Sequence, residues 1–395
     1  MKNNQSQNMH LFCFDPIYPK NEGFMKRVNY GGGGEEFQVE SGAVYNENGT
    51  VSLSYYNPKA LKVEVRYRKH NYKFAKSEYR KDPDFYKNDY VFEPMIKGDD
   101  DYWRSIINPG AGFHSIFYYV DGVRTINTQG PYGYDDDGIR NFVDIPDDED
   151  TQIHDVPHGA ITREMYKSSE TGRYRACWVY TPASYATGNK RYPVLYIQHG
   201  GTQDEVCWFQ SGKIDMILDN LIAKGEAEEM IVVCNNGYVF KQLENGNFIE
   251  GRLDNVIIKD CIPYIDKKYR TIPERRKRAA AGLSMGGGHA RRLGFGHPDV
   301  FANAGLFSSG ECFPIVTEDM DFSDLFSDQK KFNELMDVVY VTCGESDPRY
   351  DKTCSDLKPL QQKGFNIEFK GYQGQHEWNV WRYSAKDFVK KLFKI

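Results

Sequence analysis

The stretch AAAGLSMGGGHA, residues 279–290, places one serine among four glycines directly after a run of small residues. Residues 282–286 within it match the pattern G-x-S-x-G. In that pattern the serine stands on a sharp turn that lifts its hydroxyl above a sheet, and the flanking glycines avoid collisions with the neighbouring strand and helix. A glycine-rich connection without any chemistry would also give such a sequence. The choice between the two depends on what precedes and follows Ser284.

Strands and helices alternate in the sequence from about residue 154 onward. Three apolar runs predict buried strands: RACWVYTP (175–182), PVLYIQHG (193–200) and MIVVCNNG (230–237). The segment KIDMILDNLIAKG (213–225) has the spacing of an amphipathic helix. Repeated β-α units imply a mostly parallel sheet with helices on both faces. Because a strand is predicted before Ser284 and a helix over residues 285–295, we expect Ser284 to be a nucleophile.

The first part of the chain has a different sequence pattern, without the alternation of strands and helices. Residues 1–34 show little periodicity and end in four glycines, so we expect an arm and a linker there. In LKVEVRY (61–67) apolar and charged residues alternate with the period of a half-buried strand. Short runs of this kind, separated by turn signals, predict an all-β sandwich over residues 35–150, followed by the α/β domain over residues 151–395.

The composition limits the classes of protein that this chain can belong to. With 40% hydrophobic and 27% charged residues, the 395 residues are typical of a soluble globular protein. A net charge of −6 argues against nucleic acid as a partner, and the lack of a long apolar stretch argues against a membrane span. The first residues lack the apolar core of a signal peptide, so we expect a cytoplasmic protein whose eight cysteines stay reduced. No ligand spacing predicts a metal or an organic cofactor, and the oligomeric state stays open.

A serine hydroxyl becomes a strong nucleophile only when a base removes its proton. In proteins with this motif the chain order is serine, then acid, then histidine, so the base must follow Ser284. His289 and His297 lie on or at the end of the helix that Ser284 opens, and we expect them to point away from the hydroxyl. His376 lies in the loop GYQGQH after the last predicted strand. It is the third histidine after the serine and the predicted base.

Asp347 is the predicted acid that orients His376 and stabilises its cationic form. It comes shortly after the strand-like run VVYVTC and precedes the histidine along the chain. Glu345 is the second candidate. Asp337 begins the same strand, which would place it at the wrong edge of the sheet.

Acyl transfer also needs two N–H donors for the negative charge that develops on the carbonyl oxygen. The backbone N–H of Met285, at the start of the helix, is predicted to be one of them. The other is expected in the loop QHGGT (198–202), whose glycines let the main chain approach a substrate closely. We favour the N–H of Gly201, with that of Thr202 as the alternative.

Three motifs together resemble carbohydrate esterase family 1, the feruloyl and acetyl-xylan esterases: GLSMGG (282–287), QHGGTQDEVCW (198–208) and GQHEWNVWR (374–382). The resemblance extends over about residues 158–394 and implies an α/β-hydrolase fold. It also implies Ser284 as nucleophile, His376 as base and Asp347 as acid, in agreement with the reading of the residues themselves. The chain departs from the family at Thr202-Gln203, where many members continue with glycine and an acidic residue.

The segment WRSIINPGAGFHSIFYYVDG (103–122) is similar to the early-set, immunoglobulin-like carbohydrate-binding modules of family 48, which are often fused to such esterases. Tyr132 and Tyr134 are candidates for stacking on a sugar or phenolic ring at the catalytic mouth, with packing at the sandwich edge as the alternative. Trp208 and Trp378 are candidates for shaping the substrate pocket, as is Trp381, and a structural role is the alternative for all three.

These inferences predict a serine esterase that releases hydroxycinnamoyl groups, such as ferulate, from plant cell-wall oligosaccharides through an acyl-enzyme. An acetyl-xylan esterase, a trilactone siderophore esterase and an acyltransferase would use the same scaffold and stay open as alternatives. A binding module with an inactive hydrolase domain is the alternative outside enzymes, and the complete set of Ser284, Asp347 and His376 argues against it. The expected partner is a small-molecule or oligosaccharide ester, and no cofactor is expected.

Overall fold

The computed structural model describes the following segments of the chain: 25–27, 37–39, 42–68, 90–135, 138–242, 245–309, 316–317 and 320–394. The chain divides into two compact units, Met1–Ile153 and His154–Ile395. Within the predicted arm over residues 1–34, the described part is β1 (Met25–Arg27), which pairs with β2 (Phe37–Val39). The rest of that arm, with its four glycines, lies outside the described residues.

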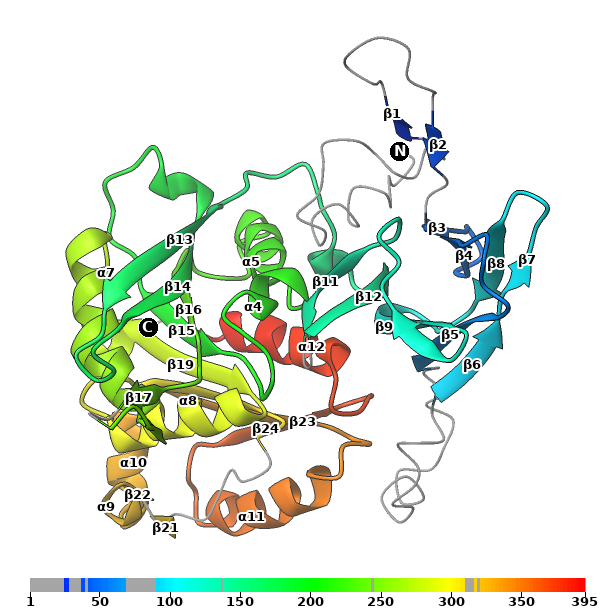
Figure 1. Ribbon diagram of the computed structural model, residues 1–395. Helices are drawn as coiled ribbons and strands as arrows, with labels where there is room; N and C mark the ends of the chain where they lie inside the picture. Colours follow the sequence, from blue (N-terminus) through cyan, green and yellow to red (C-terminus); the bar gives the residue numbers. More distant parts are fainter. Residues whose placement is uncertain are drawn as a thin grey trace. The chain divides into compact units, whose positions relative to one another are not determined.

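The first unit is a sandwich of two antiparallel sheets (Figure 1). One sheet has the strand order β3-β4-β8-β7, and the other has the order β11-β12-β9-β5-β6 with β10 paired to β9. The bounds of these strands are β3 (Ala43–Tyr45), β4 (Val51–Tyr56), β5 (Val63–Arg68), β6 (Tyr90–Pro94), β7 (Ile96–Lys97), β8 (Tyr102–Ile107), β9 (Gly112–Val120), β10 (Val123–Thr125), β11 (Tyr132–Asp135) and β12 (Gly138–Ile145).

Alternating side chains from both sheets form the core of this sandwich. In β5 the side chains of Val63, Val65 and Tyr67 are buried, and the residues between them are half-exposed. They share one apolar cluster with Leu53 and Trp103 of the facing sheet. The alternation read from the sequence builds this core from Val63 onward, whereas Leu61, which precedes β5, is 89% exposed.

The second unit is built on an eight-stranded sheet with the order β13-β14-β16-β15-β19-β20-β23-β24. The six strands from β16 to β24 in this order run parallel, whereas β13 and β14 pair in the antiparallel sense. The strand bounds are β13 (Ala160–Lys167), β14 (Tyr174–Thr181), β15 (Val194–Gln198), β16 (Ile231–Asn235), β19 (Arg278–Leu283), β20 (Asn303–Phe307), β23 (Val338–Gly344) and β24 (Glu368–Tyr372). Cys177, Cys234 and Cys343 lie in these strands as buried cysteines outside any disulfide.

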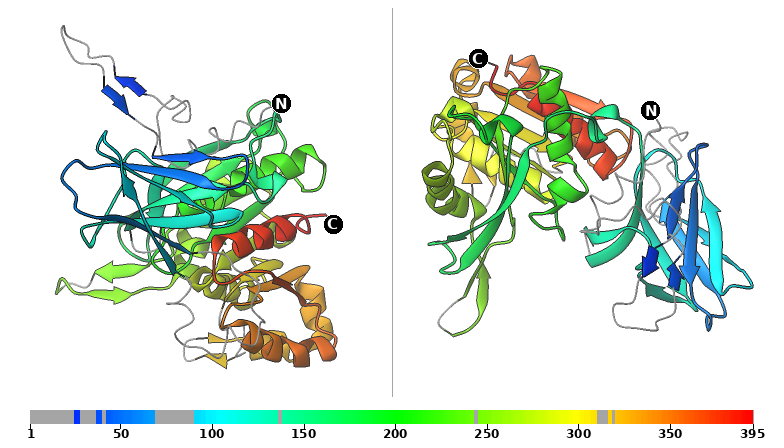
Figure 2. Two further views of the ribbon diagram at one scale, coloured as in Figure 1. Left: turned by 90° about the vertical axis from the view of Figure 1, so that its right-hand side faces the viewer. Right: turned by 90° about the horizontal axis from the view of Figure 1, so that it is seen from above.

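Helices cover both faces of this sheet (Figures 1 and 2). On one face lie α5 (Ile214–Ala223) and α12 (Trp378–Val389), which contact each other. On the other face the helices share one apolar cluster with the sheet, and they are the π-helical stretch η4 (Val256–Cys261), α7 (Ile262–Lys268), α8 (Met285–Gly296), α10 (Gln329–Leu335) and α11 (Tyr350–Gln362). The second unit is therefore an α/β-hydrolase domain, as the alternation of strands and helices in the sequence predicts.

Several short elements connect the main ones. They are η2 (Glu149–Thr151), η3 (Ala183–Tyr185), α4 (Cys207–Gln210), α6 (Leu253–Asn255), η5 (Arg275–Lys277), α9 (Ser323–Phe326) and the paired strands β21 (Val316–Thr317) and β22 (Met320–Asp321). The sequence analysis did not predict the hairpin of β17 (Phe240–Gln242) and β18 (Phe248–Glu250), which projects from the second unit in Figure 2.

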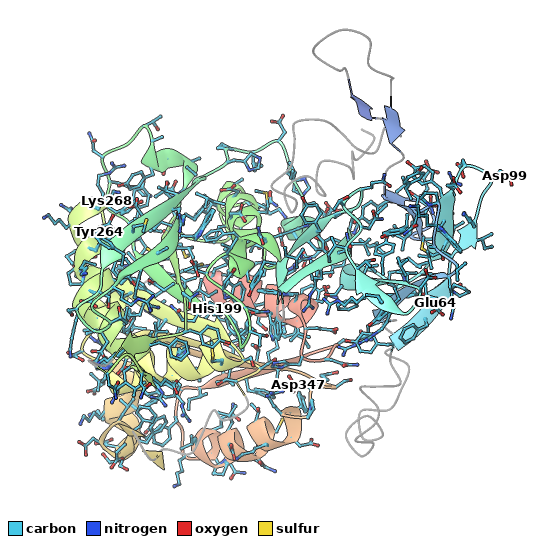
Figure 3. The ribbon with its side chains drawn as sticks, in the orientation of Figure 1. Glu64, Asp99, His199, Tyr264, Lys268 and Asp347 are labelled. Atoms are coloured by element: carbon cyan, nitrogen blue, oxygen red, sulfur yellow. The ribbon has the colours of Figure 1, made fainter. Side chains whose placement is uncertain are left out.

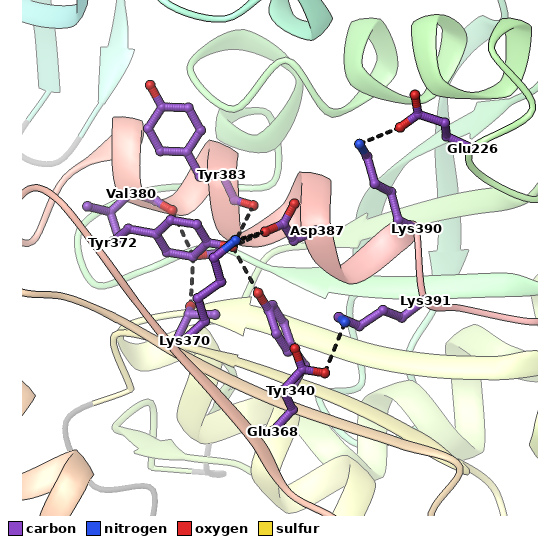
Figure 4. A network of polar contacts seen from close by, with 12 residues as sticks. Glu226, Tyr340, Glu368, Lys370, Tyr372, Val380, Tyr383, Asp387, Lys390 and Lys391 are labelled. Carbon is purple, nitrogen blue, oxygen red and sulfur yellow. Dashed lines mark hydrogen bonds and ion pairs between the residues drawn. The ribbon is translucent and has the colours of Figure 1, made fainter.

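A polar network ties α12 to the edge strand β24 (Figure 4). The carboxylate of Asp387 on α12 accepts a hydrogen bond of 2.6 Å from the hydroxyl of Tyr372 and another from the ammonium of Lys370. The hydroxyl of Tyr340 on β23 lies 2.9 Å from that of Tyr372. Burial raises the pKa of Tyr372, so its phenol stays protonated. The network therefore holds the strand that leads to His376.

The helices of the described segments include none that is long and apolar enough to cross a membrane.

Candidate active site

Ser284 forms the turn between β19 and α8. Its backbone has φ 51° and ψ −117°, and a positive φ is uncommon for a residue with a side chain. The Ser284 N–H donates a hydrogen bond of 2.8 Å to the Phe307 carbonyl, and the Ser284 carbonyl accepts one of 3.0 Å from the Gly287 N–H. These bonds hold the strained turn from both sides. The Ser284 side chain lines a cleft of about 1060 Å³.

Close packing explains the glycines around this turn. A Cβ atom at Gly282 would lie 2.3 Å from the Gly286 carbonyl oxygen. At Gly286 it would lie 2.4 Å from the carbonyl oxygen of Gln198 and 2.5 Å from that of His199. Real Cβ atoms do not approach backbone atoms so closely, so α8 can begin against β15 only if these positions lack side chains. The G-x-S-x-G pattern is therefore a packing requirement of the turn.

Asp347 and His376 form a close pair. The Nδ1–H of His376 donates to the Asp347 Oδ2 at 2.7 Å, an assignment that follows because a carboxylate only accepts. This tautomer leaves the His376 Nε2 free to act as an acceptor. Asp347 is fully buried and also accepts a hydrogen bond of 3.0 Å from the Arg349 N–H. Burial pushes the pKa of Asp347 upward, but the hydrogen bond from His376, the charge of that ring and the contacts with Arg349 outweigh it and hold the pKa below its usual value.

The two other acids considered in the sequence are placed differently. His376 makes its carboxylate contact with Asp347 and not with Glu345. Asp337 is the partner of Arg276 in an ion pair of 2.6 Å, just before β23 begins, at the opposite edge of the sheet from Asp347. The geometry thus favours the acid that the sequence predicts.

The serine and the histidine share one edge of the sheet. Ser284 follows β19 and His376 follows β24, and the parallel strands between them end at the same edge. Asp347 lies at this edge, as does His199, which follows β15 (Figure 3). Both Ser284 and His376 are described, and no hydrogen bond joins them. Such contacts are often long before a substrate binds, so their role as nucleophile and base stays a prediction.

The loop after β15 is held in place by two side chains. The Gly200 N–H donates to the Oε1 of Gln203 at 2.9 Å, and this glutamine is 3% exposed. His199 donates from Nδ1 to the Gly200 carbonyl at 2.7 Å and accepts at Nε2 from the Gly237 N–H at 2.8 Å. Burial lowers the pKa of His199, which fits this neutral tautomer. Gln203, one of the two residues at which the sequence departs from the family that it resembles, therefore builds the loop.

The candidate oxyanion donors differ in their availability. The Thr202 N–H donates to the Tyr238 hydroxyl, so this alternative donor is already engaged. The N–H groups of Gly201 and Met285 donate no hydrogen bond to the described residues. A Cβ at Gly201 would meet nothing within 4 Å. This arrangement favours the N–H groups of Gly201 and Met285 as the two oxyanion donors. That role stays a prediction.

His289 corrects one expectation. The sequence analysis leaves it out of the site, but His289 lines the same cleft as Ser284. The reason is that a residue five positions into a helix can still border a groove that runs along that helix. Its Nε2 is buried without a hydrogen-bond partner, and burial lowers its pKa to about 4. His297 instead lies 3.3 Å from Asp254 through its Nε2.

The tryptophans pack inside the domain. Trp208 is 1% exposed, and its indole N–H donates to the Gln198 carbonyl at 2.8 Å. Trp378 is 4% exposed and stands perpendicular to Trp208 at 5.4 Å between ring centroids. Such burial leaves no free indole face, which argues against the predicted contact of Trp208 and Trp378 with substrate. Trp381 is also buried, and its ring meets that of His376 edge to face at 5.0 Å.

Tyr132 and Tyr134 both lie on β11 of the first unit. Tyr132 is partly buried and Tyr134 is 45% exposed. Their predicted contact with substrate stays a prediction. Groups of three or more histidine, cysteine, aspartate or glutamate residues that could hold a metal do not occur in the segments described above.

Arg349 is a site residue that the sequence analysis missed. Its Nη1 lies 3.3 Å from the Asp347 Oδ1 and 3.5 Å from the His376 Nδ1, and its side chain lines the cleft. Its position in the sequence, two residues after Asp347, could have indicated this contact. A long side chain that follows an acid so closely can turn back toward the carboxylate.

The fold and this site define a class, an α/β hydrolase with a serine elbow and an Asp–His pair on one edge of its sheet. Residues 168–392 match the Esterase family, and the chain belongs to this family. A curated relative, the endo-1,4-beta-xylanase/feruloyl esterase of Xylanibacter ruminicola, is 31% identical over 294 residues. The alignment covers 72% of this chain but 38% of the relative, so the chain spans less than half the length of that protein.

Solved structures show the same likeness. A ferulic acid esterase superimposes with a TM-score of 0.51 at 27% identity, over 60% of this chain and 98% of that one. The enterobactin esterase of Shigella flexneri superimposes with a TM-score of 0.58 over 87% of this chain and 93% of that one. Its 14% identity shows a shared fold alone. The resemblance to feruloyl esterases read from the three motifs is confirmed.

Proposed function

We propose that this chain hydrolyses hydroxycinnamoyl esters of plant cell-wall oligosaccharides, with Ser284 as nucleophile, His376 as base and Asp347 as acid. The observation that carries the proposal is the elbow conformation of Ser284 on the sheet edge that also holds the Asp347–His376 pair. The choice of acyl group is supported by the relatives described above as feruloyl or ferulic acid esterases.

In the proposed reaction the Ser284 oxygen attacks the ester carbonyl while the His376 Nε2 accepts the hydroxyl proton. The N–H groups of Met285 and Gly201 stabilise the negative charge on the carbonyl oxygen. His376 then passes the proton to the departing sugar alcohol, which leaves an acyl-enzyme. A water molecule, deprotonated by the same imidazole, releases the acid and restores the serine.

Asp347 has two tasks in this scheme. Its hydrogen bond to Nδ1 fixes the tautomer that exposes Nε2, and its charge stabilises the imidazolium that forms during each proton transfer. Its lowered pKa keeps the carboxylate ionised at neutral pH. The scheme requires the Ser284 hydroxyl and the His376 ring to come within hydrogen-bonding reach when substrate binds.

The test is a comparison of kcat/KM for methyl ferulate, p-nitrophenyl acetate, acetylated xylan and a trilactone siderophore. We expect turnover of methyl ferulate and of the activated acetate. A preference for acetylated xylan or for the lactone would replace the proposed substrate class by that alternative. Transfer of the feruloyl group to an added sugar in place of water would identify an acyltransferase, and a lack of turnover with all four would overturn the proposal.

A further inference from the structure

The cleft beside Ser284 is dominated by basic side chains. Five of its described lining residues are basic: Arg252, Arg291, Arg292, Arg349 and Lys352. Glu250 is the one acidic residue among the described residues that line it. His289, whose pKa is lowered by burial, adds no charge at neutral pH. This balance contrasts with the chain as a whole, which has a net charge of −6.

The floor of the cleft follows helix α8. Residues three, four and seven positions apart on a helix share one face, so Ser284, Gly288 and Arg291 lie in a row, with Arg292 beside them. A Cβ at Gly288 would meet nothing within 4 Å, and the floor is therefore open one turn beyond the serine. With a rise of about 1.5 Å per residue, the arginine pair lies about 10 Å along the helix from Ser284.

The walls of the cleft carry cations that are more exposed than their acidic partners. Arg252 is 42% exposed, while Asp254, 2.6 Å from it, is 2% exposed. Arg349 is 39% exposed, while Asp347, 3.3 Å from it, is buried completely. In the third pair Lys352 is 55% exposed and Asp356 is 18% exposed at 2.8 Å. The carboxylates fix the positions of the basic groups, and the ends that reach solvent are the positive ones.

We infer that the alcohol part of the substrate carries a carboxylate, which binds in this basic cleft beside the scissile ester. The inference rests on the proposed function, because the acyl group of that function is neutral and a negative charge must therefore belong to the alcohol part. A hydroxycinnamoyl group has no carboxylate apart from the ester itself, and its phenol, with a pKa near that of tyrosine at about 10, is neutral at pH 7. Arginine binds a carboxylate with two parallel hydrogen bonds, which gives direction as well as charge.

The alcohol that leaves in this reaction keeps its carboxylate unchanged. The bond between the carbonyl carbon and the alcohol oxygen breaks, the proton from Ser284 passes through His376 to that oxygen, and the acid remains on the alcohol. Two sources share this chemistry, namely a small hydroxy acid and a uronate residue of an oligosaccharide.

The experiment uses two matched substrate pairs with the full chain. The first pair is feruloylquinate and its methyl ester, which differ in one charge. The second pair is a feruloylated oligosaccharide with a uronate residue and the same compound with that carboxyl reduced. We expect kcat/KM to be about 10- to 100-fold higher for the charged member of at least one pair, as one charge-assisted contact provides, and the advantage to shrink with added salt.

The pair that shows the preference identifies the source of the carboxylate. Equal turnover of charged and neutral members in both pairs would overturn the inference and leave the proposed esterase in place. A lack of turnover with all four compounds would overturn both.

Variants locate the effect in the cleft. Arg292→Gln and Lys352→Gln should each lower the ratio of kcat/KM for the charged over the neutral member by about 10-fold. Lys358→Gln is the matched control, because Lys358 is an exposed lysine of the same helix α11 that does not line the cleft. Its ratio should equal that of the unmodified chain. An equal loss in all three variants would point to the net charge and would contradict a binding site in the cleft.

Discussion

The glycines that flank Ser284 and the glycine one turn further along α8 differ in how tightly they are packed. At Gly282 and Gly286 an added Cβ would lie within 2.5 Å of backbone atoms, whereas at Gly288 it would meet nothing within 4 Å. The elbow is thus fixed by main chain against main chain, and the groove beyond it is shaped by long side chains around an open floor. The comparison teaches that in this molecule the reactive position is set by backbone packing, and that recognition depends on side chains which can vary without disturbing it.

The largest effect is expected at the elbow itself. Ser284→Ala removes the nucleophile and should lower kcat for methyl ferulate by about 10⁶-fold, the loss seen when a triad acts as a unit. Circular dichroism should show an unchanged fold, because the substitution removes one oxygen atom from a residue that lines the cleft. Near-full activity would contradict the assignment and direct attention to Ser308 or Ser309, which are buried in the loop after β20.

Asp347→Asn should give the next largest loss. The amide favours the wrong histidine tautomer, and the expected fall in kcat is about 10⁴-fold. Glu345→Gln is the matched control, since Glu345 makes no contact with His376, and it should keep most of the activity. A large loss with Glu345→Gln and a small one with Asp347→Asn would exchange the two roles.

Gly286→Ala tests the packing of the elbow directly. Its Cβ would press on the carbonyl oxygens of Gln198 and His199, so we expect the free energy of unfolding to fall by about 1–3 kcal/mol. Thermal unfolding measures this change, and the same variant should lose activity because the serine moves. An unchanged melting temperature would show that the close contact is not a constraint.

Gln203→Ala tests the loop opposite the elbow. The Gly200 N–H would lose its buried acceptor, and the loop that carries the Gly201 N–H would shift. We expect kcat to fall by about 10-fold, less than the roughly 10²–10³-fold loss that follows complete removal of an oxyanion donor. An effect on KM alone would argue that the loop binds substrate without stabilising the transition state.

Gly288→Ala should have the smallest effect and sharpens the contrast with Gly286→Ala. Alanine favours a helix over glycine, so the unfolding free energy should rise by about 0.5–1 kcal/mol. Urea unfolding would check the sign of this change. Destabilisation comparable to that of Gly286→Ala would mean that both positions are equally crowded.

The fold and the candidate serine elbow could be read from the sequence because both leave a pattern in short segments of the chain. Alternating strand and helix patterns predict the parallel sheet, and the G-x-S-x-G pattern marks the elbow even though the backbone that crowds Gly286 belongs to the distant strand β15. The pairing of His376 with Asp347 follows from chain order, since parallel strands end at one edge.

The features that escaped prediction depend on contacts between distant segments. The burial of Trp208 is caused by Trp378, 170 positions later in the chain and packed against it at 5.4 Å. The place of His289 in the lining of the cleft depends on segments distant in the chain, and the hairpin of β17 and β18 carries no strong alternating pattern. The hydrophobic periodicity of a segment predicts the structure of that segment. It does not predict which distant segments will pack against it.

The bonds from Tyr372 and Lys370 to Asp387 have a consequence for heat inactivation. Among the described strands β24 has a neighbour on one side only, and an edge strand opens more readily than a central one. The hydrogen bonds to α12 stabilise β24 against this local unfolding. They thereby also stabilise the loop that carries His376. Loss of these hydrogen bonds should therefore increase the rate of amide hydrogen exchange along β24. Activity should then be lost at a lower temperature than the one at which the whole sheet unfolds.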